Sequence, residues 1–486
     1  MYFTKHLLRW STLRSSIVRQ MSDNKIPLVV IIGATGCAKT KLSIDISKQI
    51  NAEIISADSM QVYKDLDIIT NKATHEERKL VRHHLIDFLD PLSRFSVVDF
   101  RNKTLEVIND LMSRGIVPIL VGGTNYYIES ILWEVLISGD EEESDDNEVP
   151  LLDREVIDCK DNHRMNENDL TKDSILCHPI FTFGLNEVSS DKLHQILEQL
   201  DPVSSQKIHP NDRRKVIRCL QIYQQKKKTK SELINEQMTA NGGSQLGGPL
   251  RFKNSVILWV DCDKFVLNQR LDERVDKMIE KGLIEELLDF HQKYNKQRIS
   301  QNLTPDYSQG IFQSIGFKEF HNYLLLTEDQ RKNNPFSKQM LNQSIDNLKL
   351  VTKRYVKHQL KWIRNRFLIN NDRAVPPIYR LDTTSSELWN QEVLETSMAI
   401  VNAFINSNDV PTHITRVPKL EIDENVSKIF ICDICNKRMS GLIAYELHLK
   451  SKGHQYFVRH KKQIHNQLIA VLNSYESKFR GNECID

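Results

Sequence analysis

Short apolar runs alternate with amphipathic segments over the first 130 residues, and the alternation resumes after residue 250. Four runs rich in branched apolar side chains predict buried strands, at residues 28–32, 53–57, 116–121 and 255–260. Helical spacing of apolar positions is clearest at residues 41–50, 100–114 and 264–292. Buried strands that alternate with helices predict an α/β fold with a parallel sheet and right-handed crossovers.

The segment between the third and fourth predicted strands has a different pattern. The acidic run at 140–148 predicts a solvated loop. Helical spacing dominates from 150 to 245, and the glycine-rich stretch 241–249 predicts a flexible connection. We interpret residues 136–250 as an acidic loop followed by a helical insertion.

The remaining boundaries follow from the same pattern. The core is predicted in two parts, and its second part ends in an unusually basic helix at 345–366. A loose linker that carries one helix, near 386–405, separates the core from a small module. The predicted boundaries are 25–135 and 251–370 for the core, 371–427 for the linker, 428–465 for the module and 466–486 for a tail.

The first 24 residues differ in composition from the rest. Up to Gln20 they contain lysine and arginine, several Ser and Thr, apolar residues and no acid, which is typical of a mitochondrial presequence. Met21 follows directly, so initiation at Met1 or Met21 predicts a mitochondrial and a cytoplasmic form. A disordered basic tail is the alternative, and a nuclear role of the small module is left open.

The net charge of +2 conceals a segregated distribution. Acids gather at 140–148, whereas bases gather at 213–230, 349–366 and 450–462, where they suit a nucleic acid. No apolar run is long enough to cross a bilayer, so we expect a soluble protein without a membrane partner. Eight mostly scattered cysteines favour a reducing compartment, and nothing in the sequence requires more than a monomer.

The most distinctive early motif is GATGCAKT, residues 33–40, between the first strand and the first helix. Backbone N–H groups at such a helix start face phosphates, Lys39 neutralises their charge and Thr40 can hold magnesium. The motif predicts a P-loop NTPase-like core. Ala38 stands where glycine is usual, and its methyl group is expected to crowd the loop. A turn without a ligand is the alternative.

Two further groups follow predicted strands. Asp58 comes after the second strand, where open α/β sheets place their chemistry, and could accept a proton from a nucleophile. A structural cap or a magnesium partner is its other interpretation. Gly122 and Gly123 follow the third strand, directly before Thr124, and allow a ligand to approach the backbone.

Two pairs of arginines each lie on one helical face. Arg270 and Arg274 could stabilise the charge on a leaving diphosphate, or could instead pair with neighbouring acids. Arg214 and Arg218 suit an RNA backbone, or form an ordinary solvated face.

The most specific pattern is Cys432-x2-Cys435-x12-His448-x5-His454. Two thiolates on a turn and two imidazoles on a following helix complete a tetrahedral zinc site with no open position. The spacing therefore predicts a structural zinc. Lysines and arginines between residues 450 and 462 make nucleic acid its natural partner.

Eight segments, in this order, resemble the tRNA dimethylallyltransferases, which are also called tRNA isopentenyltransferases. The resemblance covers roughly residues 28–366, and the module at 428–465 is similar to the matrin-type zinc finger of the eukaryotic members. The segments are GATGCAKT, ADSMQVYKDLDI with ITNK, HHLIDFLDP, VPILVGGTNYY, HPNDRRKVIR, RLDERVDKMIEKGL, QSIGFKEF and YVKHQLKWIR.

The resemblance implies transfer of a dimethylallyl group from dimethylallyl diphosphate to N6 of adenine 37, the base just 3′ of the anticodon. On that basis Asp58 is the general base, and Thr35 and Arg274 complete the catalytic set. The implied diphosphate loop, with Mg2+ at Thr40, is Gly33, Ala34, Thr35, Gly36, Cys37, Ala38, Lys39 and Thr40. The implied contacts to the tRNA anticodon stem-loop are Asp58, Ser59, Met60, Gln61, Thr124, Arg214, Lys215, Val216, Ile217, Arg218 and Gln237.

Two other functions are weighed against this one. A P-loop kinase of a nucleoside or metabolite, with Asp58 as base, explains the phosphate loop but leaves the zinc module and the basic helices without a role. An RNA-binding protein with an inactive P-loop domain does not need the intact Lys39, Thr40 and Asp58.

Overall fold

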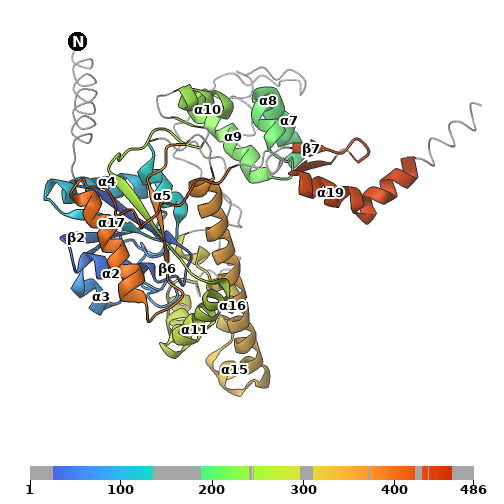
Figure 1. Ribbon diagram of the computed structural model, residues 1–486. Coiled ribbons are helices and arrows are strands. Elements are labelled where there is room, and N and C mark those ends of the chain that lie inside the picture. The colour runs from blue at the N-terminus through green and yellow to red at the C-terminus, as the bar shows by residue number, and fades with distance from the viewer. Residues whose placement is uncertain are drawn as a thin grey trace, which may run out of the picture. The chain divides into compact units, whose positions relative to one another are not determined.

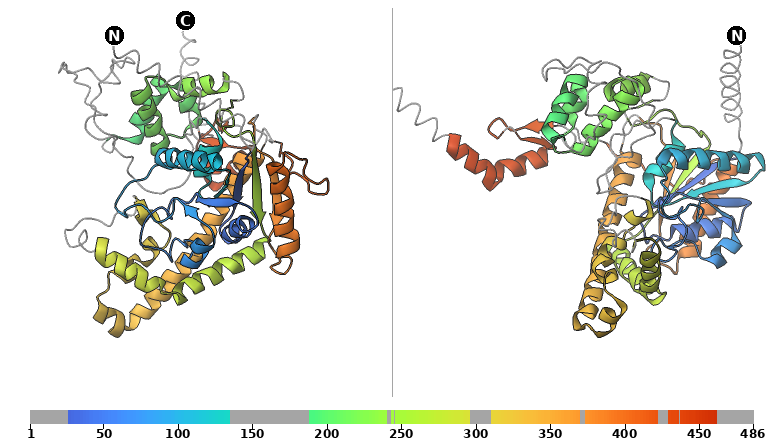
Figure 2. Two further views of the ribbon diagram at one scale, coloured as in Figure 1. Left: turned by 90° about the vertical axis from the view of Figure 1, so that its left-hand side faces the viewer. Right: turned by 180° about the vertical axis from the view of Figure 1, so that it is seen from behind.

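The computed structural model describes residues 26–134, 188–239, 243–244, 246–295, 310–369, 373–421, 429–435 and 437–461. The presequence-like segment, the acidic loop at 140–148 and the predicted tail lie outside these ranges. The chain divides into two compact units (Figures 1 and 2), which are described separately below. The core unit comprises residues up to 158 and 233–419, and the second unit comprises 159–232 and 420–486.

The core unit is built on a sheet of six strands, and every strand pair in it is parallel. The strand order is β3-β2-β4-β1-β5-β6, so β1 lies between β4 and β5. Their bounds are Leu28–Gly33 (β1), Ala52–Ser56 (β2), His83–His84 (β3), Val117–Val121 (β4), Ser255–Asp261 (β5) and Ile378–Asp382 (β6). The predicted fold class, an α/β core of P-loop NTPase type, is confirmed.

Helices cover both faces of this sheet (Figure 2). Alternate residues of β1 enter two different apolar clusters, with Val29 and Ile31 in one and Leu28, Val30 and Ile32 in the other. A strand buried on both faces explains the continuous apolar run that predicted it. The first cluster includes α2 (Lys39–Ser47), α11 (Lys264–Glu280) and α17 (Thr396–Ile405), and the second includes α4 (Val97–Ser113) and α5 (Asn125–Leu132).

The other helical segments of the core unit connect or extend these layers. The α-helices are α3 (His75–Leu80), α12 (Leu283–Phe290), α14 (Phe317–Leu324), α15 (Glu328–Asn333) and the basic helix α16 (Pro335–Ile363). The irregular helices are η4 (His291–Asn295), η5 (Gly310–Gln313), η6 (Arg364–Leu368) and η7 (Trp389–Glu395). Among the described residues, none of the helices combines the length and apolar character that a membrane crossing requires.

The predicted linker at 371–427 is wrong for its central part. β6 pairs in parallel with β5, and the helix predicted near 386–405 packs its buried residues against the sheet as α17. The strand was missed because it lies at the edge of the sheet. Its apolar residues are interrupted by exposed Arg380 and Asp382, so no continuous run marks it.

Two smaller predictions also change. The single helix expected at 264–292 breaks at Gly282, whose φ of 94° is left-handed, and continues as α12. The segment 74–90, predicted as a helix and a loop, also contains the two-residue strand β3.

The second unit contains the predicted helices and the small module. α7 (Ser190–Leu200), α8 (Pro202–Lys207) and α9 (Arg213–Lys226) share one apolar cluster. α10 (Lys230–Thr239) follows them in the chain, and from residue 233 onward it belongs to the core unit. The module consists of the antiparallel strands β7 (Ile429–Ile431) and β8 (Arg438–Ser440) and the helix α19 (Leu442–Lys450).

Candidate active site

The phosphate loop turns tightly between β1 and α2. A Cβ on Gly33 would lie 2.3 Å from the main-chain oxygen of Val260, and Gly36 has a φ of 92°, so both positions require glycine. The Lys39 amino group donates to the main-chain oxygens of Gly33 and Ala34, each at 2.9 Å. The lysine is thus held over the loop that it is expected to serve.

Ala38 occupies the left-handed region, with φ 61° and ψ 31°, directly before α2. This conformation explains why glycine is usual there, since a Cβ in it costs about 1–2 kcal/mol. The expected crowding by the methyl group is not what distinguishes this residue, because the methyl packs against the apolar cluster of the sheet. The energetic cost of alanine at this position is the strain of its left-handed backbone.

Asp58 follows β2 at the carboxyl edge of the sheet. Its Oδ1 accepts the Met60 N–H at 3.0 Å, so the carboxylate caps the turn. Burial raises the pKa of Asp58, whereas the Met60 N–H, Lys39 and Arg274 act in the opposite direction. The structure therefore brings the carboxylate within electrostatic reach of both predicted cations, and the cap and base interpretations are compatible.

The two cations are themselves desolvated. Burial lowers the pKa of Lys39 to about 8, and the Arg274 charge contributes to that lowering. Burial likewise lowers the pKa of Arg274, on α11, to about 10, although Asp58 opposes it. Two partly buried positive charges that interact with each other favour binding of an anion of high charge density.

The loop after β4 contacts the turn at Asp58. A Cβ on Gly122 would lie 2.0 Å from the main-chain oxygen of Ala57, so only glycine fits. Thr124 Oγ1 accepts the Ser59 N–H at 3.0 Å and lies 3.3 Å from Ser59 Oγ. The carboxyl ends of β2 and β4, which pair in parallel, therefore form one surface.

Gln61 fixes the turn from its other side. Its Oε1 accepts the Ser56 hydroxyl at 2.9 Å, and its Nε2 donates to the main-chain oxygens of Thr70 and Asn71 at 3.2 and 3.1 Å. The side chain is thus engaged in holding the loop after β2.

Sequence reasoning missed Gln359, near the end of α16. Its Oε1 accepts the Thr35 N–H at 2.8 Å, and its Nε2 donates to the main-chain oxygen of Gly123 at 3.0 Å. The signal was present, since Gln359 follows Thr352 and Val356 on the buried face of α16. An amide in that register needs polar partners inside the protein.

Two predicted residues are used elsewhere in the core unit. Arg270 donates to the main-chain oxygen of Thr384 at 2.9 Å and secures α11, so of the two arginines only Arg274 has the electrostatic contact with Asp58. Gln237 is buried, and its Nε2 donates to the main-chain oxygen of Ser244 at 2.6 Å.

The basic helix α9 belongs to the second unit. Arg218 is exposed, and Lys215 forms an ion pair with Asp212 at 3.1 Å. The side chains of Val216 and Ile217 are buried in the apolar cluster of that unit, so they stabilise α9 and do not form its outer face.

The predicted metal ligands come together in the small module. The four ligand atoms of Cys432, Cys435, His448 and His454 lie within 4.8 Å of one another. The His454 Nδ1 is 3.5 and 3.4 Å from the two sulfurs and 3.2 Å from His448 Nε2. Zinc bonds of about 2.0–2.3 Å give ligand separations of this size in a tetrahedron. The donors therefore fit a structural zinc.

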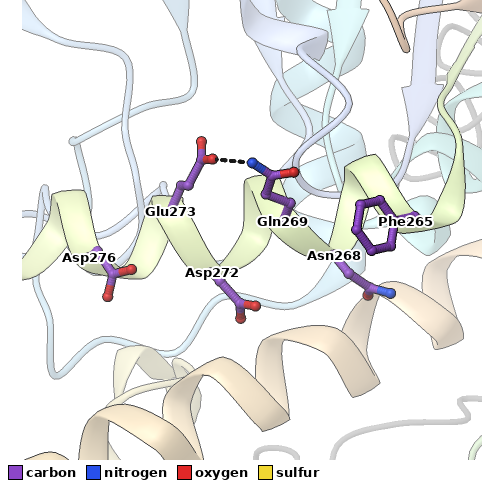
Figure 3. A pocket seen from close by; sticks show the side chains of 6 residues that line it. All are labelled: Phe265, Asn268, Gln269, Asp272, Glu273 and Asp276. Atoms are coloured by element: carbon purple, nitrogen blue, oxygen red, sulfur yellow. Dashed lines mark hydrogen bonds between the residues drawn. The ribbon is translucent and has the colours of Figure 1, made fainter.

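A separate surface depression lies along α11 (Figure 3). Its lining is Phe265, Asn268, Gln269, Asp272, Glu273 and Asp276. Three carboxylates make it unsuitable for a diphosphate, and Glu273 is already bonded to Gln269 at 2.9 Å. The depression includes none of the groups around Asp58.

Three protein-family models match parts of the chain. The family model described as IPP transferase matches residues 61–366, and the model described as isopentenyl transferase matches residues 26–92. A third model, described as a zinc-finger of C2H2 type, matches residues 430–454.

Individual relatives cover nearly the whole chain. The chain is 41% identical over 450 residues to a tRNA dimethylallyltransferase of Homo sapiens, covering 92% of this chain and 89% of the relative. It is 32% identical to a tRNA dimethylallyltransferase of Schizosaccharomyces pombe, and the match covers 92% of this chain and 98% of that relative. A solved structure, described as a eukaryotic dimethylallyltransferase acting on tRNA, is 27% identical to this chain and superposes on it with a TM-score of 0.68. The match covers 93% of this chain and 100% of the chain in that structure.

Proposed function

Because the chain belongs to the IPP transferase family of tRNA dimethylallyltransferases, we propose that it transfers a dimethylallyl group from dimethylallyl diphosphate to N6 of adenine 37 in tRNA. The observation that carries this assignment to particular residues is the electrostatic interaction of the Asp58 carboxylate with both Lys39 and Arg274. This arrangement provides one place for a proton and another for a leaving anion.

The donor side follows from the charges. The diphosphate binds at residues 33–40, where the backbone turns tightly and α2 begins. Lys39 and Arg274 neutralise the negative charge that grows on the diphosphate as the bond from oxygen to the allylic C1 breaks. Their low solvation strengthens this effect.

The acceptor side follows from the carboxylate. The exocyclic amino group of adenine is a weak nucleophile, so its attack on C1 benefits from a base. The new N6–C1 bond forms, the diphosphate leaves with its electron pair, and Asp58 accepts the proton that N6 loses. Thr124 and Ser59 position the turn that carries Asp58. The adenine must leave its stack to reach this point.

Magnesium accompanies the diphosphate in this proposal. The exposed hydroxyl of Thr40, in the first turn of α2, is the ligand that the chain offers to it. When bound, Mg2+ neutralises diphosphate charge alongside Lys39 and Arg274.

Binding of the anticodon stem-loop is assigned to two basic regions. Arg214, Lys215 and Arg218 on α9 suit phosphates of a single-stranded loop. The zinc module adds basic side chains near the end of α19, among them Lys450 and Lys452. A nucleoside kinase would leave both regions without a role. The relatives of this chain are named as transferases and do not favour a kinase.

The test is incubation of the protein with labelled dimethylallyl diphosphate, Mg2+ and unmodified tRNA. Label is expected in the tRNA, on N6 of the adenine 3′ of the anticodon. ATP consumption without transfer of label would favour the kinase alternative. Binding of tRNA without either reaction would favour an inactive RNA-binding protein.

We also propose that one gene supplies two forms of a monomeric enzyme. Initiation at Met1 retains the presequence-like segment and directs the protein to mitochondria, whereas initiation at Met21 leaves it in the cytoplasm. Fluorescent fusions that begin at either methionine are expected to differ in distribution. Identical distributions would exclude the two-form proposal.

A further inference from the structure

Gln359 is a buried amide between apolar neighbours on α16. Only 4% of its surface is exposed, and Val356 and Ile363 precede and follow it on the buried side of α16. Both ends of the amide are nevertheless satisfied, because Oε1 accepts the Thr35 N–H at 2.8 Å and Nε2 donates to the Gly123 oxygen at 3.0 Å. One side chain therefore joins two loops that are far apart in the sequence.

The two loops serve different substrates in the proposed reaction. Thr35 belongs to the phosphate loop, on the donor side. Gly123 precedes Thr124, which holds the Ser59 N–H beside Asp58 on the acceptor side. A Cβ built on Gly123 would lie 2.7 Å from Gln359 Nε2 and 3.7 Å from Asp58 Oδ2. The amide thus lies against the acceptor loop close to the carboxylate.

The helix backbone at Gln359 is also tied to the acceptor loop. Asn125 Nδ2, at the start of α5, donates to the main-chain oxygen of Gln359 at 3.4 Å. Side chain and main chain of the same residue therefore contact consecutive parts of the segment 123–125. A neutral glutamine is suited to the bridge, because a carboxylate can accept but not donate and an aliphatic side chain can do neither.

We propose that Gln359 is a positioning residue that fixes the phosphate loop relative to the acceptor loop, so that the allylic carbon and the adenine amino group are held in line. The proposal rests on the function proposed above. A displacement of about 1 Å between reacting groups can lower a rate about 100-fold without changing affinity. Binding of a diphosphate is also communicated to residues 122–125 through this amide.

Three variants test the proposal. Gln359→Met removes both hydrogen bonds at similar size, and Gln359→Glu removes only the donor until the carboxyl group is protonated. Thr352→Val is the matched control, since Thr352 is buried on the same helix and, among the residues that the structure describes, its hydroxyl bonds to the Leu348 oxygen of α16 alone. We expect Gln359→Met to lower the single-turnover transfer rate about 100-fold, with affinities for pyrophosphate and tRNA within about threefold of wild type.

The Glu variant distinguishes positioning from general stability. Its transfer rate, divided by that of wild type at each pH, is expected to rise as pH falls, since a protonated carboxyl group can again donate to the Gly123 oxygen. A ratio that is flat with pH, or an equal rate loss in Thr352→Val, would overturn the proposal.

Hydrogen exchange, which needs no catalysis, tests the bridging role of Gln359 independently of the proposed transfer reaction. In wild type, inorganic pyrophosphate with Mg2+ is expected to slow hydrogen exchange at both 33–40 and 118–126. In Gln359→Met the slowing is expected only at 33–40. Slowing of both segments in the variant, or of only the first in wild type, would overturn the proposal. Absence of transfer by wild type would count against the proposed function alone.

Discussion

Ser59 and Thr124 are 65 residues apart in sequence, yet the Ser59 N–H donates to Thr124 Oγ1 at 3.0 Å. The bond ties the turn after β2 to the loop after β4, and Asp58 is the residue just before the donor. A single hydroxyl therefore helps to set the position of the proposed base.

Thr124→Val removes this acceptor and leaves the Ser59 N–H without it. We expect a single-turnover transfer rate about tenfold lower, consistent with a hydrogen-bond loss of about 1–1.5 kcal/mol. Thr124→Ser keeps the hydroxyl and is the control, expected to remain near the wild-type rate. Equal losses in both variants would show that the hydroxyl alone does not account for the role of Thr124.

Asp58→Asn tests the base separately from the cap. The amide oxygen can still accept the Met60 N–H, which is bonded at 3.0 Å in the native protein, but the side chain can no longer take a proton. The transfer rate is expected to fall by about 100- to 10,000-fold, while tRNA affinity is retained. Rapid-quench single-turnover assays and filter binding measure the two quantities. A variant that keeps its rate would exclude Asp58 as the base.

The pH dependence of kcat/KM for the donor is expected to be bell-shaped. On the acid side, activity falls as pH decreases through the raised pKa of Asp58, because the base becomes protonated. On the alkaline side, it falls as pH increases through the Lys39 pKa of about 8, because the cation is lost. Lys39→Arg should move only the alkaline limb, to higher pH. Lys41→Arg, at the exposed partner of Asp45, is the control and should leave both limbs in place.

Ala38→Gly should stabilise the core unit. Relief of the left-handed backbone exceeds the extra freedom of glycine in the unfolded chain, so a gain of about 0.5 kcal/mol in the free energy of unfolding is expected. The same exchange at Ala52, in the regular strand β2, should lower that free energy by about 0.5–1 kcal/mol. Urea unfolding of both variants measures the difference. The same sign of change at the two positions would contradict the strain at Ala38.

Removal of zinc should separate tRNA binding from chemistry. Cys432→Ser combined with Cys435→Ser unfolds a module whose stability depends on the metal. The dissociation constant for tRNA is expected to rise about tenfold or more, with the single-turnover rate at saturating tRNA unchanged. Asp433→Asn, at an exposed position between the two ligands, is the control. A large fall in the saturated rate would refute this division of labour.

The features that sequence predicted well are local. The strand β1, the glycine turn and the start of α2 follow from one stretch of residues, and the zinc ligands follow from spacing alone. The neighbourhood of Asp58, Lys39 and Arg274 required the resemblance as well, since the three are contributed by separate segments of the chain.

The features that were missed depend on tertiary contacts. The edge strand β6 acquires its structure by pairing with β5, and its exposed Arg380 and Asp382 disguise it as linker. Gln359 acquires its role only from partners 324 and 236 residues away. Arg270 and Arg274 look equivalent on a helical wheel, and only packing assigns the first to Thr384.

The order of strands in the sheet has a consequence for synthesis of the protein. β1, which carries the phosphate loop, pairs on one side with β4 but on the other with β5, which begins at Ser255. Arg274 and Gln359 come later in the chain, and the edge strand β6, which completes the sheet, follows both. A ribosome must therefore complete the helices at 190–239 before β1 can acquire its second neighbour. The nascent chain therefore contains the basic helix α9 before it contains all the residues that surround Asp58.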